Sequence, residues 1–411
     1  MGMRIIADLH LHSKYSRATS GNSDLEGLSE WAQTKGIGLL GSADFTHPKW
    51  LGELKKKLKD EGEGIFSYKN TKFMLTTEVS NIFYRKDVNK KVHNILFAPS
   101  LGVVGQICEG LKRFGKLEED GRPILNLDII EMMEILHGIS REIYVVPAHA
   151  WTPWFGVFGS KSGFDSLEEA FGKYSKDIFA LETGLSSDPA MNWMLSSLDR
   201  ITLISNSDCH SPQKLGREAN VFELEKITYK SVMEAIKTKK GFVKTYEFYP
   251  EEGKYHWDGH RDCKVCLSPE ASMKMGDMCP VCKKKLTVGV LHRVAALADR
   301  KEGFVPPNSV PFTRLIPLME IIASVRDAGV ATKGVQEEYF RIVNYFGNEF
   351  AALEAPEENL LLASDKVLAK AIVKARDGQV YWKPGFDGEF GEMRWEKPKE
   401  DPKSQKSLMD F

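Results

Sequence analysis

The sequence lacks the features that mark membrane, secreted and strongly charged proteins. None of its apolar runs reaches the roughly 20 residues that a membrane-spanning helix needs. Its first eight residues form a strand-like run without the apolar stretch and cleavage site of a signal peptide, which predicts an intracellular, cytoplasmic protein. The net charge is only −1, from 56 Lys and Arg against 57 Asp and Glu. Affinity for nucleic acid therefore requires local patches of charge.

Glutamine is also scarce, with six residues in the chain, while Lys and Glu abound, a composition that mildly indicates a thermophile. Hydrophobic residues make up 42% and charged residues 27% of the sequence, which is typical of a globular protein. At 411 residues the chain exceeds what one hydrophobic core usually organises. We therefore expect two or more domains.

Four segments follow one another along the chain. Residues 1–247 alternate short β-branched runs with amphipathic stretches, the pattern of a parallel βα sheet or barrel. Residues 248–292 hold four cysteines, residues 293–394 regain helical periodicity after a proline-rich joint, and residues 395–411 form a polar tail. The predicted strands lie near Arg4–Leu9, Gly38–Ala43, Phe73–Glu78, Val92–Phe97, Ile143–Ala148, Ile178–Glu182 and Ile201–Asn206, and predicted helices include Asp24–Lys35, Leu315–Ala328, Val335–Phe346 and Val367–Ala375.

Histidines and carboxylates gather near the carboxyl ends of these strands, where the loops of a βα barrel assemble an active site. His10 and His12 leave the same face of the first strand, and Asp208 and His210 repeat that spacing after the last one. Alone, any such histidine is more often a surface or core residue. Together, the donors exceed the needs of one ion, which predicts two or three metals sharing carboxylates. The candidate ligands are His10, His12, Asp44, Glu78, His93, His149, Asp208 and His210.

The order and spacing of these motifs resemble the polymerase and histidinol phosphatase (PHP) superfamily. The resemblance rests on Asp8–Ser13, Glu78, His93, Pro147–His149 and Ser207–Ser211 and covers most of residues 1–247. It implies a distorted seven-stranded βα barrel, (β/α)7, whose multinuclear metal centre hydrolyses phosphoesters. The implied fold class is thus α/β, with the barrel followed by a small zinc module and a mostly helical C-terminal domain.

Two positions depart from the superfamily pattern. Its usual Asp-His pair is Asp44-Phe45 here, with His47 two residues later, and Ala18 stands where many members carry a further histidine. His47 is therefore a candidate substitute ligand at a rearranged metal position.

Four of the six cysteines form two CxxC pairs separated by twelve residues, a spacing that suits a tetrahedral zinc site. Neither pair opens a helix after a strand, which argues against a redox role. We expect a structural zinc bound by Cys263, Cys266, Cys279 and Cys282. Cys108 and Cys209 are interpreted as buried small hydrophobes, although Cys209 lies between two candidate ligands.

A basic stretch follows the second pair, with a local net charge of about +5 that could follow phosphates. A solvated charged surface is the alternative. Aromatic residues crowd the loop after His149, where they could stack on a base or wedge a duplex, and a hydrophobic lid explains them equally well. The candidate DNA contacts are Trp151, Trp154, Lys283, Lys284, Lys285 and Arg293.

Further motifs resemble the endonuclease Q family, namely Ala43–Pro48, Pro311–Leu318 and the run from Tyr339 to Phe350. The resemblance covers nearly the whole chain. It implies an archaeal-type DNA repair endonuclease that cuts 5′ to uracil, hypoxanthine, xanthine or an abasic site and leaves 3′-hydroxyl and 5′-phosphate ends. Glu78 and Asp208 are the expected catalytic carboxylates, with zinc, magnesium or manganese as catalytic metals.

The resemblance implies double- or single-stranded DNA as the partner and no membrane. We therefore expect the protein to associate with the nucleoid. Two other functions stay open. One is a small-molecule phosphatase of the histidinol phosphate type, which would not need the zinc module. The other is a non-catalytic DNA-binding accessory protein, against which the near-complete ligand set argues.

The last residues resemble the docking motif of the sliding clamp (PCNA). Gln405, Leu408 and Phe411 match its Gln, aliphatic and aromatic anchors, while its second terminal aromatic is missing. We expect this tail to bind a clamp at micromolar strength, and a bare polar terminus is the alternative.

Overall fold

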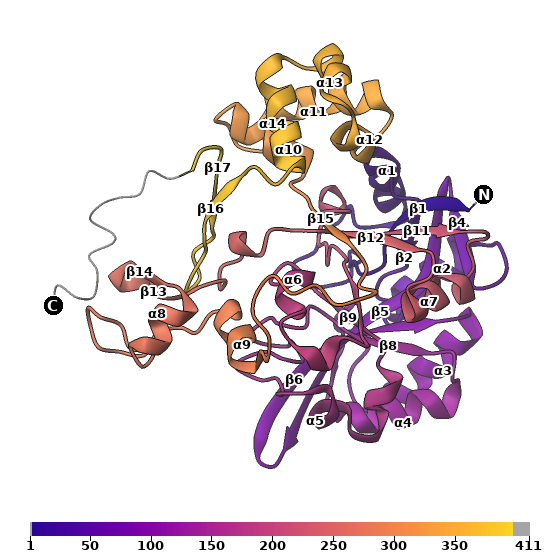
Figure 1. Ribbon diagram of the computed structural model, residues 1–411. Helices are drawn as coiled ribbons and strands as arrows, with labels where there is room; N and C mark the ends of the chain where they lie inside the picture. Colours follow the sequence, from indigo (N-terminus) through magenta and orange to yellow (C-terminus); the bar gives the residue numbers. More distant parts are fainter. Residues whose placement is uncertain (1, 398–411) are drawn as a thin grey trace.

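The computed structural model describes residues 2–397, so the candidate clamp contacts Gln405, Leu408 and Phe411 lie outside the described residues. An 11-stranded mixed sheet lies at the centre of the first unit (Figure 1). Within residues 2–397, no helix is both long enough and apolar enough to span a bilayer. The main strands are β1 (Met3–Asp8), β2 (Leu39–Gly41), β5 (Thr71–Arg85), β6 (Val88–Ala98), β8 (Tyr144–Pro147), β11 (Ala219–Leu224) and β12 (Phe242–Glu247), joined by the short strands β3 (Lys59–Asp60), β4 (Ile65–Tyr68) and β7 (Ile124–Leu125).

The strand directions differ from the parallel pattern that the sequence predicted. β1, β2 and β5 are parallel neighbours, whereas β5–β6, β6–β8, β1–β11 and β11–β12 are antiparallel. The two-residue turn between β5 and β6 explains one reversal, because Lys86 and Asp87 both adopt positive φ, at 52° and 61°. Turns of this kind match the twist of an antiparallel hairpin. Each of the seven predicted strands nevertheless overlaps an observed one.

The remaining two predicted strands, β9 (Ala180–Glu182) and β10 (Thr202–Ile204), hydrogen-bond in parallel to each other. One apolar cluster nevertheless takes side chains from β1, β2, β5, β6, β8, β9, β10 and β11, among them Ile5, Phe97 and Phe222. A barrel interior requires such a shared core. Closure of the strands into a barrel stays a prediction.

Helices pack around this sheet, and their ends follow local sequence signals. α1 (Leu25–Lys35) begins at Asp24, whose side chain accepts from the Gly27 N–H, and ends at Gly36, which adopts a φ of 91°. Both are residue types that favour these cap positions, and the observed bounds agree with the predicted helix Asp24–Lys35. The other long helices of the unit are α2 (Pro48–Lys57), α3 (Leu101–Leu111), α4 (Ile129–Ile139) and α7 (Tyr229–Thr238), with shorter helices α5 (Leu167–Phe171) and α6 (Pro189–Asn192).

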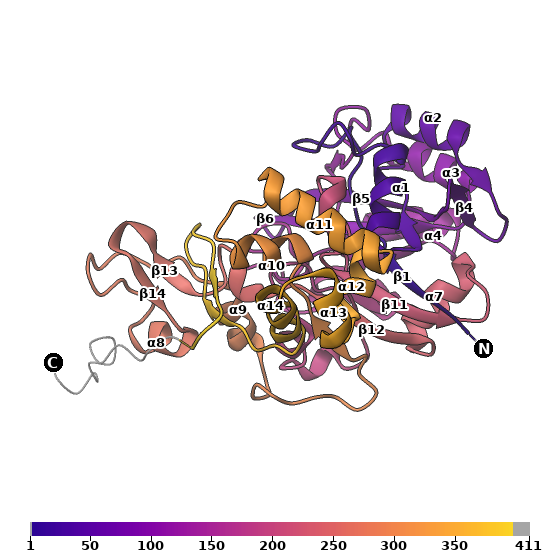
Figure 2. The same cartoon turned by 90° about the horizontal axis from the view of Figure 1, so that it is seen from above.

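The cysteine-bearing segment forms the hairpin β13 (Asp258–His260) and β14 (Val265–Leu267), followed by α8 (Pro269–Lys274) and α9 (Val290–Leu297). Figures 1 and 2 both place β13, β14 and α8 at one end of the molecule. Its own apolar core is small, with Val265, Cys279 and Leu286 as the buried members.

The C-terminal segment is mostly helical, and it joins both other units. Strand β15 (Phe312–Arg314) extends the first unit's sheet beside β12. A final hairpin, β16 (Tyr381–Lys383) and β17 (Glu392–Arg394), reaches the cysteine-bearing segment, where Trp257 N–H donates to the Gly385 carbonyl. The helices between them are α10 (Leu318–Val325), α11 (Lys333–Phe346), α12 (Glu349–Glu354), α13 (Glu357–Ala363) and α14 (Lys366–Arg376), of which α10, α11 and α14 were predicted.

Candidate metal centre and DNA-facing residues

The segment after β1, the middle of β5 and the loop after β10 bring four metal-ligating side chains together. His10, His12, Glu78 and Asp208 each place a ligand atom within 4.8 Å of the others. His12 Nε2 lies 3.0 Å from Asp208 Oδ1. Yet within residues 2–397 His10 Nε2, His12 Nε2 and Asp208 Oδ1 are buried without a hydrogen-bond partner. Buried polar atoms rarely stay unpaired, so this convergence fits a metal ion.

A second group lies beside the first and shares Glu78 with it. Glu78 Oε1 lies 2.7 Å from His93 Nδ1 and 3.0 Å from His149 Nε2, while Glu78 Oε2 lies 3.2 Å from His12 Nε2 in the first group. One carboxylate between two donor sets is the arrangement of a two-metal site. The structure thus brings together six of the predicted ligands, His10, His12, Glu78, His93, His149 and Asp208.

Two further carboxylates contact the Nδ1 atoms of His10 and His12, on the side of each ring away from the ligand atom Nε2. Asp44 Oδ1 lies 3.1 Å from His12 Nδ1, and Asp44 Oδ2 accepts from the N–H and hydroxyl of Ser13. Glu182 Oε1 and Oε2 both lie 3.0 Å from His10 Nδ1. Carboxylates in this position fix the ring orientation of metal-bound histidines. The prediction of Asp44 as a direct ligand therefore differs from the structure, where its oxygens face His12 Nδ1. Sequence reasoning missed the role of Glu182, because a Glu at the end of a strand has the same sequence pattern whether it binds a metal or orients a histidine.

Three residues at the centre adopt backbone angles that non-glycine residues rarely take. The φ angles are 29° at Asp44, 30° at His149 and 46° at Asp208. Each such residue costs about 1–3 kcal/mol and is kept where the surroundings fix it, often at functional sites. Here the Asp208 N–H donates to the His10 carbonyl, and the His149 N–H donates to Glu182 Oε2, over 2.9 and 2.8 Å.

His47 and His210 lie outside both groups. His47 caps α2, its Nε2 lies 3.1 Å from the Glu118 carbonyl, and its ring stacks on Tyr15 at 4.5 Å. His47 as a substitute metal ligand stays a prediction, and in this structure its imidazole faces Glu118 and Tyr15 and belongs to neither group. The His210 ring lies 4.5 Å from that of His12, and its Nδ1 lies 3.1 Å from the Asp208 carbonyl, at the edge of the first group.

Arg122 is a residue of the centre that sequence reasoning missed. Its Nη1 lies 3.1 Å from Glu78 Oε2. The preceding Gly121 packs directly on Asp44, where a Cβ would lie 2.3 Å from Asp44 Oδ2. The Gly121 N–H also donates to the Tyr15 carbonyl over 3.0 Å. A lone Arg in a loop gives no periodic or motif signal, so only the fold shows where it lies.

The charges of the centre keep Glu78 ionised. Burial alone would raise the pKa of Glu78, but the fixed charge of Arg122 and a hydrogen bond with His10 hold that pKa well below its usual value. Burial lowers the pKa of His93 to about 4, so its imidazole is neutral at pH 7. A charged carboxylate and a neutral imidazole are the forms that bind metals.

The cysteine module forms a ligand group whose membership differs from the predicted set. His260, Cys263, Cys279 and Cys282 place their ligand atoms within 4.8 Å of one another. Cys266 Sγ instead lies 4.0 Å from the Pro384 carbonyl.

The pairing of β13 with β14 explains why His260, and not Cys266, belongs to the ligand group. His260 lies opposite Val265, and Gly259 lies opposite Cys266, so His260 and Cys266 point to opposite faces of the two-stranded ribbon. The spacing His260-x-x-Cys263 repeats that of Cys279-x-x-Cys282, and this repeat is the sequence pattern that could have identified His260 as a ligand.

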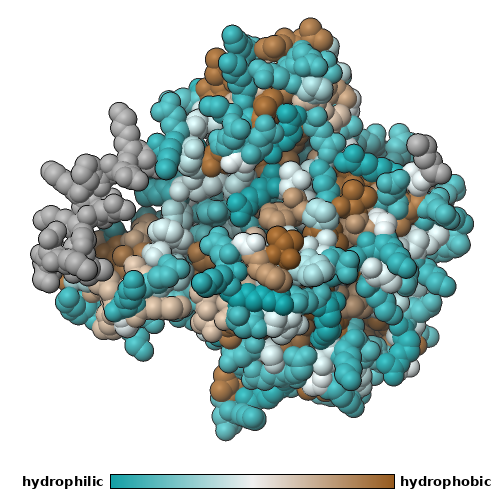
Figure 3. Space-filling view, viewed as in Figure 1, coloured by the Kyte–Doolittle hydropathy of each residue, from teal (hydrophilic) through white to brown (hydrophobic). Residues whose placement is uncertain are grey.

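The candidate DNA contacts divide into exposed and buried residues. Trp154 is 43% exposed, and Lys283, Lys284 and Lys285 lie on the surface. Figure 3 shows a largely hydrophilic face with scattered hydrophobic residues.

Trp151 and Arg293 differ from the prediction that they contact DNA. Trp151 is fully buried, and its Nε1–H donates to Asn192 Oδ1. Arg293 donates to the carbonyls of Phe158 and Phe164 and to Asp165, so it ties α9 to the first unit.

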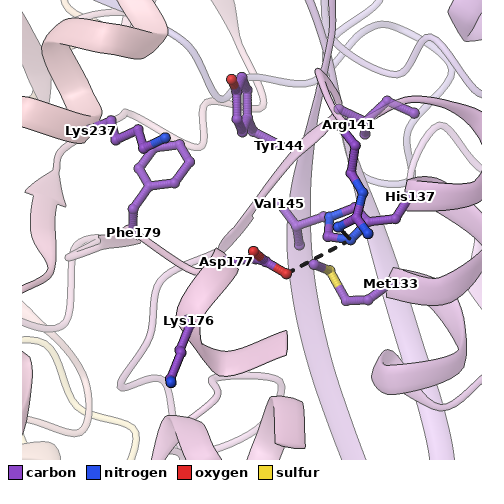
Figure 4. A pocket seen from close by; sticks show the side chains of 10 residues that line it. Met133, His137, Arg141, Tyr144, Val145, Lys176, Asp177, Phe179 and Lys237 are labelled. Carbon is purple, nitrogen blue, oxygen red and sulfur yellow. Dashed lines mark hydrogen bonds and ion pairs between the residues drawn. The ribbon is translucent and has the colours of Figure 1, made fainter. Parts of the chain in front are cut away.

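A basic cavity of about 260 Å³ is lined by residues of α4, of the start of β8 and of α7, and Figure 4 shows its side chains. Arg141, Lys176 and Lys237 line it, and Asp177 pairs with His137 there. Because strands place their active-site loops at the carboxyl end, this cavity is separate from the metal centre.

Comparisons with known proteins place this site in a family. The lesion-specific endonuclease PfuEndoQ from Pyrococcus furiosus superposes with a TM-score of 0.86 at 35% identity, covering 95% of both chains. An endonuclease Q in complex with a 27-mer duplex substrate that carries an abasic lesion at the active site superposes with a TM-score of 0.85, at 34% identity, covering 96% of this chain and 97% of that one.

Two curated relatives are named as uncharacterized proteins. MJ0043 of Methanocaldococcus jannaschii is 30% identical over 313 residues, 74% of this chain and 37% of its own length. YqxK of Bacillus subtilis is 29% identical over 413 residues, 95% of this chain and 99% of its own. Residues 317–379 match the MJ0043 C-terminal domain family.

The fold, the histidine and carboxylate centre and these matches define a hydrolytic nuclease. Since the identity to PfuEndoQ extends over nearly the whole of both chains, the protein belongs to the endonuclease Q family.

Proposed function

We propose that this DNA repair endonuclease hydrolyses the phosphodiester 5′ to uracil, hypoxanthine, xanthine or an abasic site and leaves 3′-hydroxyl and 5′-phosphate ends. The observation that carries the proposal is Glu78, whose two oxygens face two separate donor sets. The family relative bound to abasic-lesion DNA supports the substrate class.

The side chains of both groups would hold the catalytic metals, and the proposed ions are zinc, magnesium or manganese. His10, His12 and Asp208 would hold one ion, His93 and His149 the other, and Glu78 both. When bound, such ions lower the pKa of water and stabilise charge on the leaving oxygen. Asp44 and Glu182 would orient the histidine rings. Because the ions would supply an activated water, no side-chain nucleophile is needed.

Arg122 is the candidate contact for the scissile phosphate. Its guanidinium touches Glu78, yet its side chain keeps 27% of its surface exposed at the centre. A guanidinium pairs well with a phosphate oxygen and gains strength as negative charge develops in the transition state. The chain thereby supplies one fixed positive charge beside the metals.

The exposed residues Trp154, Lys283, Lys284 and Lys285 are proposed to contact the duplex. The lysines would bind phosphates without reading sequence, and Trp154 would stack on or wedge the bases. The module of His260, Cys263, Cys279 and Cys282 would hold one structural zinc.

Incision assays on matched duplexes test the proposal. A duplex with one central uracil, hypoxanthine or abasic site should be cut on the lesion strand at the 5′ side, while the undamaged duplex stays intact. A small phosphomonoester tested in parallel should turn over poorly. Fast turnover of the monoester without incision would favour the small-molecule phosphatase instead.

We also propose that the tail docks on a sliding clamp through Gln405, Leu408 and Phe411. Aliphatic and aromatic anchors on a short segment are how such peptides bind. Calorimetry with a clamp should show micromolar binding that the double variant Leu408→Ala, Phe411→Ala loses without a change in incision. Equal binding by both proteins would refute the docking motif.

A further inference from the structure

The basic cavity of Figure 4 gathers cations from separate elements of the first unit. Arg141 follows α4, Lys176 belongs to the 3₁₀ helix η1 (Gly172–Asp177), and Lys237 belongs to α7. Figure 4 shows Lys237 on one side of the cavity and Arg141 on the other. Asp177 is the one carboxylate among the described lining residues, so the lining carries an excess of positive charge.

The three cations lack carboxylate partners, although a neighbouring lysine has one. Among residues 2–397, no carboxylate oxygen lies within 4.0 Å of the charged nitrogens of Arg141, Lys176 or Lys237. By contrast, Lys173 in the same 3₁₀ helix lies 2.6 Å from Glu134 Oε1. A cavity lined by charges of one sign concentrates ions of the opposite sign, so this lining favours an anion.

His137 orients Arg141 at the cavity. Arg141 Nη1 lies 2.8 Å from His137 Nδ1, and Asp177 Oδ2 lies 3.8 Å from the same nitrogen. Burial lowers the pKa of His137, so its ring is neutral at pH 7 and its Nδ1 accepts from the guanidinium. Among the described residues the guanidinium makes no other hydrogen bond. Its remaining N–H groups can therefore bind a ligand, and their fork geometry suits a phosphate.

The apolar part of the lining includes two aromatic rings. Tyr144 and Phe179 are half-buried, and their rings meet edge to face with centroids 5.2 Å apart. Met133 and Val145 are buried beside them in the lining. Nucleobases stack on aromatic side chains of this kind. The cavity thus combines a site for negative charge with a surface for a flat ring.

The charge and the volume of the cavity together select among phosphates. A phosphate monoester carries a charge of about −1.5 to −2 at pH 7, whereas each phosphate inside a DNA strand carries a single charge. The cavity volume of about 260 Å³ lies just below the range of about 300–1,000 Å³ that is typical of small-molecule pockets. One small molecule fits such a cavity, and a duplex does not.

We infer that this cavity binds a nucleoside monophosphate, with its phosphate held by the cations of the lining and its base against Tyr144 and Phe179. No member of the two metal-binding groups lines the cavity among the described residues. The site is therefore separate from the metal centre, and the proposed incision does not depend on it.

Calorimetric titration of the full-length protein with deoxyuridine 5′-monophosphate tests this site. The double variant Arg141→Gln, Lys237→Gln should bind the nucleotide at least about tenfold more weakly than the parent, because it loses charge-assisted contacts. Both side chains are exposed, so this variant should unfold at the temperature of the parent. Lys173→Gln is the matched control, since Lys173 pairs with Glu134 outside the lining and should leave binding unchanged.

Deoxyuridine and inorganic phosphate test the two parts of the ligand separately, and each should bind more weakly than the nucleotide. Deoxyuridine binding as tightly as the nucleotide would overturn the phosphate site, and inorganic phosphate binding as tightly would overturn the assignment to a nucleotide. Equal binding of the nucleotide by the double variant and the parent, or no binding by the parent at about 1 mM nucleotide, would overturn the site as a whole. Displacement of the nucleotide by an undamaged duplex would overturn it in favour of a DNA contact.

Discussion

Substitutions in the cysteine module give the sharpest separation between the ligand set predicted from sequence and the one that the structure shows. His260→Ala and Cys263→Ser each remove a member of the group within 4.8 Å, whereas Cys266→Ser removes a thiol that faces Pro384. We therefore expect the first two variants to lose about one zinc per chain and Cys266→Ser to keep it.

The stability effect follows from the small core of the module. Val265 and Leu286 are its buried aliphatic side chains among the described residues, and they contribute about 1.5–3 kcal/mol each. Structural zinc contributes on the order of 10 kcal/mol in isolated finger peptides. The module should therefore unfold locally when the zinc is lost, while the first unit, with its own large core, stays folded.

Elemental analysis of zinc per chain, with limited proteolysis of residues 258–286, measures both effects. His260→Ala and Cys263→Ser should be cleaved rapidly in this segment, and Cys266→Ser should resist cleavage like the parent. Loss of zinc from Cys266→Ser, together with its retention in His260→Ala, would refute the assignment of His260 and restore the four-cysteine set.

Three further predictions concern the centre, the DNA surface and the buried carboxyls. Arg122→Gln should slow incision about 10–100-fold, because a charge-assisted contact is worth about 1.5–3 kcal/mol. Arg122→Lys should partly restore the rate, and the metal content should be unchanged in both variants. Metal loss in Arg122→Gln would show a purely structural role. Neutralising Lys283, Lys284 and Lys285 together should reduce the slope of log affinity against log salt by up to about 2.7, for damaged and undamaged DNA alike. Filter binding measures this slope. A loss of affinity for lesion-containing DNA alone would contradict the prediction. Burial raises the pKa of Glu247 to about 8. The folded state therefore binds an extra proton between about pH 4.5 and 8, and stability falls as pH rises through this range. Glu247→Gln should flatten that fall by up to about 1.4 kcal/mol per pH unit in urea unfolding, and an unchanged slope would place the proton elsewhere.

The strands and most metal ligands could be predicted from the sequence because both carry local signals. The i, i+2 spacing of His10 and His12 predicted that their rings converge, although β1 ends at Asp8, and apolar runs mark strands such as β6 and β8. The antiparallel hairpin β5–β6 escaped because its turn, Lys86-Asp87, lacks the glycine that usually marks such turns.

Other parts of the site depend on contacts between distant residues. A carboxylate beside a histidine can bind a metal or orient the ring. Only the fold separates Glu78, which faces two donor sets, from Asp44 and Glu182, which face histidine Nδ1 atoms. Arg122 reaches Glu78 across 44 residues of chain, so no local pattern marks it.

Incision of a uracil-containing duplex by the parent and by Asp208→Asn tests the central claim, that the shared His and carboxylate groups form the catalytic centre. The account predicts loss of incision by on the order of 100-fold or more in Asp208→Asn, because Asp208 Oδ1 is one of the converging ligand atoms, with DNA affinity largely retained. Asp87→Asn, in the exposed turn between β5 and β6, is the matched control and should cut like the parent. Incision by Asp208→Asn at near the parent rate would contradict the assignment of this centre.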